Sequence, residues 1–310
     1  MKKAGIFSLA IAFLFASNLY SQSGWQWLNP IPQGNGINKV KFYDANTGYA
    51  VGRSNTVIKT TNGGENWILV NNGIRSLIGT GTELWAGILK SFAIINENTV
   101  IAGGNGIIKT TNGGTTWFSI GGDVTNVTGI AFANSNTGFA STSLGKLYRT
   151  TNQGATWLLN GTYGTEIDDI YFASQQAGMF SAMVSGSVTI YYSTTTGDTW
   201  TQTYTSSTDF IHHFDFINST TGYALTDKYS LPSKLLKTTN GGVNWQLLRN
   251  LPFGSGFDNS FEMVSEQTGY VYSNVVYGTF RRTTNEGQSW DSIPLRDVPT
   301  TGIFTLAFKN

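Results

Sequence analysis

The side chains best suited to acid–base chemistry lie in the segment "YGTEIDD" at positions 163–169. Adjacent residues of a regular strand point to opposite sides, so Asp168 and Asp169 do not form a carboxylate pair. Glu166 and Asp168 share one side, roughly 7 Å apart by strand rise, which is compatible with an inverting glycosidase. A solvated acidic segment at the start of a strand explains the same pattern without catalysis. We therefore predict no catalytic residue and keep Glu166 and Asp168 as the catalytic alternative.

Both histidines lie in a second segment, "YTSSTDFIHHFD" at 204–215. His212 and His213 are adjacent, so they also face opposite sides and do not form a two-histidine metal site. His213 and Asp215 can meet on one side, where a structural hydrogen bond is favoured over an acid–base dyad. Because the chain has two histidines, no cysteine and no acidic cluster, we predict no metal site and no cofactor.

The composition and the first residues indicate where the chain works. Charged residues make up 12% of 310 and the formal net charge is +1, so no overall field attracts nucleic acid or an anionic membrane. The segment "MKKAGIFSLAIAFLFASNLYS" (1–21) has two lysines and then a short apolar run, which predicts a secretory signal peptide. That run is shorter than a membrane span requires. We expect residues 22–310 to be exported to the periplasm, the cell surface or the medium, with no transmembrane segment.

The elements that position these side chains are predicted by a repeat. An eight-residue box, first seen as "TTNGGENW" at 60–67, occurs six times, and its closing tryptophans are 50, 40, 43, 45 and 45 residues apart. A second pattern precedes each box, as in "IAFANSNTGFA" from 130, and one copy, "SFAIINENTVIAGG" from 91, is degenerate. Four short strands that recur every 40 to 50 residues predict an all-β fold, a β-propeller of four-stranded blades.

The box itself has the composition of a turn. Its third residue is Asn in five copies, and an Asn side chain can accept hydrogen bonds from backbone amides two residues on. Its fifth residue is always Gly, as a positive φ requires, and the Trp can pack against the hairpin. We assign a structural role to Asn62, Gly64, Trp67, Asn112, Gly114, Trp117, Asn152, Gly154, Trp157, Gly197, Trp200, Asn240, Gly242, Trp245, Asn285, Gly287 and Trp290. The cation before five boxes also repeats, and we expect it to be solvated or locally hydrogen-bonded: Lys59, Lys109, Arg149, Lys237 and Arg282.

The box resembles the Asp-box, or bacterial neuraminidase repeat (BNR), with Asn in place of the usual Asp. Together with "NTGYAVG" from 46 it resembles the photosystem II assembly/stability factor-like propellers, over about residues 25–308. The resemblance implies a secreted or lumenal propeller, and its relatives hold membrane-protein precursors through an arginine-rich surface. Sialidases and sortilin-type receptors carry the same box. A sialidase is disfavoured, because the chain has no "FRIP" stretch and only seven arginines, of which Arg149 and Arg282 belong to the repeating position.

The two ends resemble parts of one further blade. "GWQWLNPIP" from 24 is similar to a fourth strand, and "TGIFTLAF" at 301–308 is similar to a first strand. We therefore predict a seven-blade plan over residues 22–310, with six complete Asp-box repeats and a partial, incomplete seventh blade.

Function is expected in the segments that do not repeat. By the resemblance, the connections into the first strands share a face with the turns between second and third strands. The binding residues predicted on this face are Arg53, Arg75, Trp85, Tyr163, Phe210, His212, Lys228, Phe253 and Phe257. They predict a non-enzymatic scaffold for binding or assembling a protein partner, in the cell envelope or outside the cell. The alternatives are a carbohydrate-binding protein or glycosidase, with a glycan as partner, and a propeller module of a larger surface adhesin.

Overall fold

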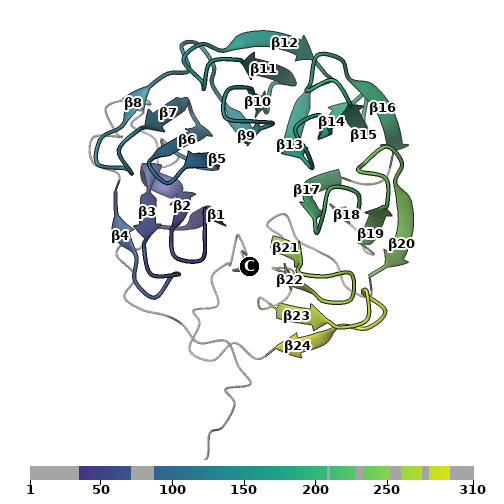
Figure 1. The fold of residues 1–310 in the computed structure, drawn as a ribbon. Helices are drawn as coiled ribbons and strands as arrows, with labels where there is room; N and C mark the ends of the chain where they lie inside the picture. The colour runs from purple at the N-terminus through teal and green to yellow at the C-terminus, as the bar shows by residue number, and fades with distance from the viewer. Residues whose placement is uncertain are drawn as a thin grey trace, which may run out of the picture.

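The chain folds into six four-stranded blades arranged around an axis (Figure 1). The computed structural model describes residues 35–70, 87–207, 210–227, 233–251, 260–273 and 279–293. In each blade the strands pair antiparallel in chain order, the first innermost and the fourth outermost. Six blades confirm the predicted β-propeller. The two segments predicted to form a partial seventh blade, 24–32 and 301–308, lie outside the described residues.

The blades are numbered in chain order, and the strand bounds follow. The first three blades comprise β1 (Ile37–Phe42), β2 (Gly48–Gly52), β3 (Val57–Thr60) and β4 (Ile68–Leu69); β5 (Leu89–Asn96), β6 (Thr99–Gly104), β7 (Ile107–Thr110) and β8 (Phe118–Ser119); and β9 (Val127–Phe132), β10 (Gly138–Thr142), β11 (Lys146–Thr150) and β12 (Leu158–Thr162). The last three comprise β13 (Glu166–Phe172), β14 (Gly178–Val184), β15 (Ser187–Ser193) and β16 (Thr201–Ser206); β17 (Phe210–Phe216), β18 (Gly222–Asp227), β19 (Lys234–Thr238) and β20 (Gln246–Asn250); and β21 (Ser260–Met263), β22 (Gly269–Ser273), β23 (Thr279–Thr283) and β24 (Asp291–Ile293). A short 3-10 helix, η1 (Arg53–Asn55), joins β2 to β3.

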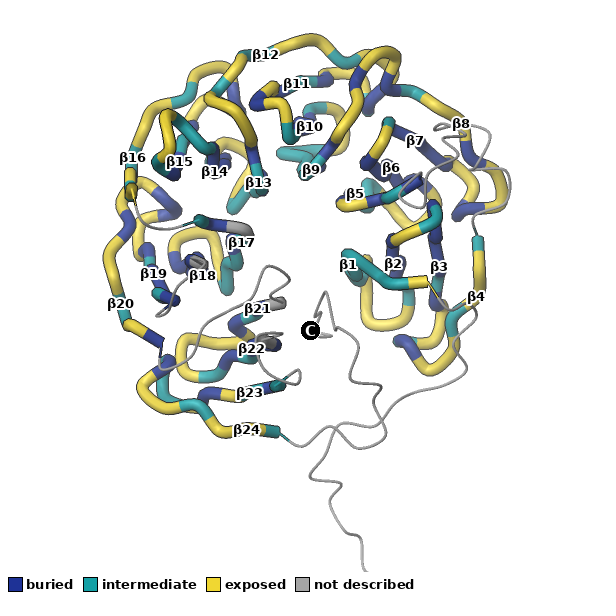
Figure 2. The backbone as a smooth tube through the Cα atoms, turned by 180° about the vertical axis from the view of Figure 1, so that it is seen from behind, coloured by how far each residue is buried: buried dark blue, intermediate teal, exposed yellow. Residues whose placement is uncertain are grey.

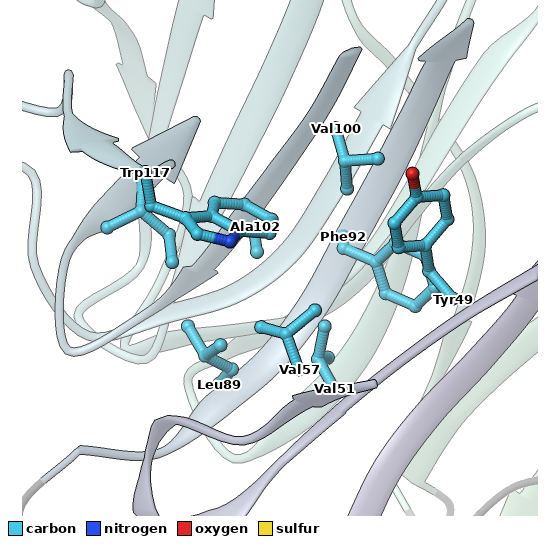
Figure 3. Packing of buried hydrophobic residues seen from close by; sticks show 9 residues of the cluster. Tyr49, Val51, Val57, Leu89, Phe92, Val100, Ala102 and Trp117 are labelled. Carbon is cyan, nitrogen blue, oxygen red and sulfur yellow. The ribbon is translucent and has the colours of Figure 1, made fainter. Parts of the chain in front are cut away.

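The hydrophobic core lies between neighbouring blades. Tyr49, Val51 and Val57 of the first blade pack against Phe92 and Val100 of the second (Figure 3). Burial follows the same radial order, because every residue of β2 is buried whereas both residues of β4 are exposed (Figure 2). Each blade therefore buries its apolar surface only against its neighbours, as repeat architectures do.

The tryptophans that close the second to sixth boxes pack against the preceding blade. Trp117 packs in the cluster between the first two blades, and its Nε1 donates to the Val70 carbonyl, 2.7 Å away. Trp200 Nε1 likewise donates to Asn160 Oδ1 of the third blade at 3.1 Å. Within its own blade a box tryptophan meets the last aromatic of the first strand edge-on, as Trp67 meets Phe42 at 6.0 Å. The indole side chain, which was predicted to pack against its own hairpin, therefore also packs in the interface with the preceding blade.

A buried hydroxyl at the first position organises every box. In the second box, Thr110 Oγ1 accepts a hydrogen bond from Gly114 N at 2.9 Å and donates to Asn112 Oδ1 at 3.0 Å. Asn112 Oδ1 in turn accepts from Thr116 N at 2.9 Å, so the side chain reaches an amide four residues on, not two as predicted. The other five boxes repeat this pattern, with Ser193 and Thr195 in the fourth. The fifth-position glycines have φ between 76° and 97°, which confirms the predicted positive φ.

The cation before the box reaches the next blade, so its contact is longer in range than the local one that the sequence suggested. Lys109 Nζ donates to the Gln153 carbonyl in the third box at 2.9 Å, and Arg149 pairs with Asp198 in the fourth at 2.6 Å. Lys237 pairs with Glu286 in the sixth box. Four of the five cations also lie over an aromatic ring of the second strand of their own blade: Lys59, Arg149, Lys237 and Arg282. These repeated contacts fasten one blade to the following box.

Replacing Thr110 by valine is expected to lower the free energy of unfolding by about 2 kcal/mol. Valine keeps the shape of the side chain but leaves the buried Gly114 amide without its acceptor, and an unsatisfied buried amide costs about 1–3 kcal/mol. The matched control is Thr111→Val at the neighbouring exposed position, which should change stability by less than about 0.5 kcal/mol. Denaturant unfolding of both variants measures the difference, and equal losses would contradict the role given to the Thr110 hydroxyl.

Candidate functional site

The inner strands repeat in backbone but not in side chains. In each of the six blades, one first-strand residue pairs with the second-strand residue that in turn pairs with the residue immediately before the box. The residues at this position are Lys41, Ala93, Ala131, Tyr171, Asp215 and Glu262. Two residues earlier, the first five blades carry Lys39, Ser91, Gly129, Asp169 and His213. Blade one is basic here, blades two and three are uncharged, and blades four and five carry acids and a histidine.

We use the name axial cluster for Lys39, Lys41, Asp169, Tyr171, His213 and Asp215, which come from β1, β13 and β17. The ion pair between Lys39 Nζ and Asp169 Oδ1, 3.7 Å, joins the first blade to the fourth. These blades are not neighbours in the ring, so the pair crosses its middle (Figure 1). The axial cluster is therefore the place in the described structure where charged side chains of three blades converge.

β-Bulges aim the side chains of the inner strands. In β13, Asp168 and Asp169 lie between the pairs Ile167↔Ala182 and Ile170↔Phe180, so two residues oppose one. The register shifts at the equivalent place in β1, β5, β9 and β17. A bulge bends the strand and breaks strict alternation, so the prediction that Asp168 and Asp169 simply face opposite sides assumed a regular strand that is not there. Asp169 is buried, with 5% of its surface exposed, and Asp168 is half-buried.

Asp169 is held as a carboxylate by partners from two other blades. Its Oδ2 accepts from Phe214 N at 3.3 Å and lies 3.5 Å from His213 Nδ1, while Oδ1 faces Lys39. Burial by itself would raise the pKa of Asp169, but Lys39 and the hydrogen bond from His213 outweigh it and hold the pKa well below its usual range. The folded state therefore stabilises the ionised form of Asp169.

His213 is paired with Asp169 of the neighbouring blade rather than with Asp215, its predicted partner on the same strand. Asp215 Oδ2 accepts a hydrogen bond from Met263 N, so this carboxylate also ties its blade to the next. Burial raises the pKa of Asp215, and His213 and the Met263 amide offset part of that rise. The structural contact predicted between His213 and Asp215 is thus made with Asp169 instead.

Lys41 is a half-buried amine near the axis. Burial, and then the neighbouring charge of Lys39, lower its pKa to about 7, while Asp169 acts weakly in the opposite direction. Its Nζ lies 5.9 Å from the centroid of the Phe92 ring. Both the neutral amine and the ammonium ion are therefore present at neutral pH.

Asp168 differs sharply from its neighbour. Burial, and then the charges of Glu166 and Asp169, raise the pKa of Asp168 to about 7, against a weaker opposing effect of Lys90. Glu166 is exposed at the start of β13. A half-buried carboxyl that is still partly protonated at neutral pH could donate a proton, which is what a general acid must do.

The segments predicted to share the binding face do lie side by side where they are described. Tyr163 N, before β13, donates to the Gly145 carbonyl in the β10–β11 turn at 2.7 Å. Arg53 N, at the end of β2, donates to the Gly36 carbonyl before β1 at 2.9 Å. Phe210 is the first residue of β17, and His212 follows on the same strand. The remaining predicted binding residues lie outside the described residues: Arg75, Trp85, Lys228, Phe253 and Phe257.

Tyr163 packs inward. Its ring centroid lies 4.9 Å from that of Phe180 and 5.0 Å from that of Tyr191, and burial raises the pKa of its hydroxyl. The Tyr163 side chain therefore contributes to the interface between blades three and four. Its predicted role in binding stays a prediction.

Two further observations bound the chemistry of the described residues. They contain no group of three or more His, Cys, Asp or Glu side chains arranged to hold a metal ion. Within the same ranges, no helix has the length and apolar character needed to cross a membrane.

Six antiparallel four-stranded blades, each with a BNR box between its third and fourth strands, define a BNR-repeat β-propeller. Residues 17–165 match the family model described as photosynthesis system II assembly factor YCF48. The chain is therefore a BNR-repeat β-propeller that is similar to the YCF48 family over residues 17–165, just under half of its length. No curated protein sequence matches it.

Solved structures with low sequence identity have the same fold. YCF48 bound to a D1 peptide is 17% identical with a TM-score of 0.59, and the match covers 87% of each chain. YCF48 from Cyanidioschyzon merolae is 18% identical with a TM-score of 0.62, covering 86% of this chain and 87% of that one. The GH74 xyloglucanase from Xanthomonas campestris is 13% identical with a TM-score of 0.65, covering 85% of this chain. The match spans 46% of the length of that enzyme.

Proposed function

We propose that this chain is an exported, non-enzymatic β-propeller that binds a protein partner and holds it for assembly, in the cell envelope or outside the cell. The likeness to YCF48 carries the proposal, because residues 17–165 match that family and a YCF48 structure contains a bound D1 peptide. The predicted signal peptide at 1–21 supports export. The partner of this chain is proposed to be a protein of the envelope.

We use the name loop face for the connections into the first strands together with the turns between second and third strands. The contrast between repeating and non-repeating parts of the blades supports a binding role for this face. Boxes, box tryptophans and inter-blade cations repeat, and each has a structural contact. The loop face does not repeat in sequence, and its backbone is tied together by bonds such as Thr165 N to the Met183 carbonyl at 2.8 Å. Variable segments on a rigid scaffold are where proteins place binding residues.

Closure of the ring is part of the proposal. The first and sixth blades stand at the two ends of the arc of described blades (Figure 1). We propose that the segments 24–32 and 301–308 complete a partial seventh blade between them, as their similarity to a fourth and a first strand suggests.

The binding proposal predicts that Trp85→Ala/Phe253→Ala loses a discrete envelope protein that the natural chain retains. Immobilised residues 22–310 are incubated with detergent-solubilised envelope, and the retained protein is then purified and titrated against the same chains. We expect at least about a tenfold weaker affinity for the variant, as for the loss of interface hot spots. Single-step denaturant unfolding of residues 22–310 checks beforehand that the ring is closed and cooperative.

The matched control places alanine on the outer rim, at Leu158 and Leu247, which are 72% and 52% exposed on the fourth strands. The control should bind like the natural chain. Equal weakening of both variants, or of neither, would contradict the assignment of binding to the loop face.

A carbohydrate-binding or hydrolytic role is the second candidate, and the protonated carboxyl of Asp168 is the observation that favours it. Glu166, on the same strand, would supply the second carboxylate of an inverting pair. Hydrolysis of a β-glucan that survives the combined Glu166→Gln/Asp168→Asn change would remove both residues from catalysis. A module of a larger surface adhesin would fit the same loop face with a different partner.

A further inference from the structure

The two lysines and two aspartates of the axial cluster are equal in number but are not paired one to one. Asp169 is engaged by Lys39, by His213 and by the amide of Phe214. Asp215 is engaged by the amide of Met263. The carboxylates from blades four and five are thus already committed to Lys39 and to the backbone of the following blade.

Lys41 is left without a carboxylate partner within the described residues. Its Nζ makes a ring contact with Phe92 there and has neither a hydrogen bond nor an ion pair within that part of the chain. The equivalent positions of the second and third blades are Ala93 and Ala131, which carry no charge. Placing an amine in a partly buried setting without a counter-charge is costly unless something pairs with it.

We propose that Lys41 Nζ binds a carboxylate group of a ligand that enters the middle of the ring. The carboxylate would supply the counter-charge that β5 and β9 do not provide, and Lys39 on the same strand would add attraction without leaving Asp169. This site is distinct from the loop face, and it does not depend on whether that face binds a protein.

The charges near Lys41 determine how ligand binding changes its protonation. The charges that act on Lys41 are Lys39 on its own strand and, more weakly and with opposite sign, Asp169 on β13. Tyr171, His213 and Asp215 of the same cluster lie around Asp169. Since burial and Lys39 lower the pKa of Lys41 to about 7, a carboxylate placed beside the amine raises that pKa. Binding at neutral pH therefore takes up a proton at Lys41.

The test follows the reactivity of the neutral amine. The natural chain is labelled with a trace of N-hydroxysuccinimidyl ester at pH 7, in acetate or in chloride at equal ionic strength, and each lysine is quantified by mass spectrometry. A rise in the Lys41 pKa by one unit reduces its neutral fraction from about a half to about a tenth, so labelling should slow about fivefold. A second arm replaces acetate by the end-blocked peptide Gly-Gly-Glu-Gly-Gly.

Lys109 is the matched control, because burial also lowers its pKa, but its amine donates to the Gln153 carbonyl between blades two and three. Its labelling should not respond to either probe. If acetate slows the labelling of Lys41, a small carboxylic acid is sufficient to occupy the site. If only the peptide slows it, the carboxylate comes from a protein segment. Equal slowing at Lys41 and Lys109, or no slowing with either probe, would overturn the site.

Discussion

Replacing Asp169 by asparagine is expected to lower the free energy of unfolding by about 3 kcal/mol at pH 7, the scale of loss when one partner of a buried ion pair is removed. Asparagine keeps an oxygen for the Phe214 amide, but it leaves Lys39 facing a neutral group in the middle of the ring. The same change weakens the contact with His213. Denaturant unfolding with a global fit of the midpoint and slope measures the loss.

The pH dependence of this loss has a definite sign. The folded-state pKa of Asp169 lies well below its usual range, so the stability that its carboxylate contributes is present above the unfolded-state value of about 4. That contribution declines as the pH falls from about 4 through the folded-state value. The natural chain and Asp169→Asn should therefore differ most between pH 6 and 7 and converge in acid.

A double variant separates the ion pair from simple loss of packing. Lys39→Met/Asp169→Asn removes both charges, and replacing both members of a buried pair costs less than leaving one of them alone. We expect the double variant to be less destabilised than the sum of the two single changes, with a coupling energy of about 1 kcal/mol or more. Strict additivity would contradict the ion pair across the ring.

The blades could be predicted from the sequence because their determinants are local. Apolar and polar residues alternate along each strand over a few positions. The box requires a positive φ at residues such as Gly114 and an Asn side chain that accepts a hydrogen bond within its own turn. The hydroxyl of Thr110 was missed, although Thr or Ser opens all six boxes. That invariance was the signal that the first position also carries a hydrogen-bonding role.

The inter-blade contacts could not be predicted from one blade. Lys109 looked like a solvated cation because its acceptor, the Gln153 carbonyl, belongs to the next box and is a backbone group with no sequence signature. The axial cluster was missed for the same reason. Lys39 and Asp169 meet only because the ring turns the first blade toward the fourth. Aligning the blades by register, rather than by box, would have exposed the charged positions of β1 among their uncharged equivalents.

The bulge in β13 explains why two adjacent aspartates have opposite electrostatics. An extra residue at this point gives Asp169 access to Lys39 and the Phe214 amide. Asp168 is left beside Glu166 and Asp169, two groups of its own charge, with Lys90 as a weaker opposing influence. Regular alternation would have separated these side chains by face alone, and the sequence pattern contains no sign of the bulge.

Asp168→Asn should therefore raise the free energy of unfolding at pH 8 by about 2 kcal/mol. The same substitution at the next residue, Asp169→Asn, is expected to lower it. The pKa of Asp168 is raised to about 7, so the stability associated with its protonated form is present below the unfolded-state value of about 4 and is lost as the pH rises through 7. Asparagine stays neutral and avoids that loss. A shift of about three units sets an upper limit near 4 kcal/mol, and the partial exposure of Asp168 reduces it.

The gain should grow with pH. Asp168→Asn and the natural chain should be almost equally stable at pH 4 and should diverge between pH 5 and 8. The matched control, Glu166→Gln, removes one of the charges that raise the Asp168 pKa, but it alters an exposed side chain, so its gain should be smaller and should follow the same pH range. Destabilisation by Asp168→Asn at pH 8 would mean that the favourable contacts of its carboxylate outweigh burial and the repulsion by Glu166 and Asp169.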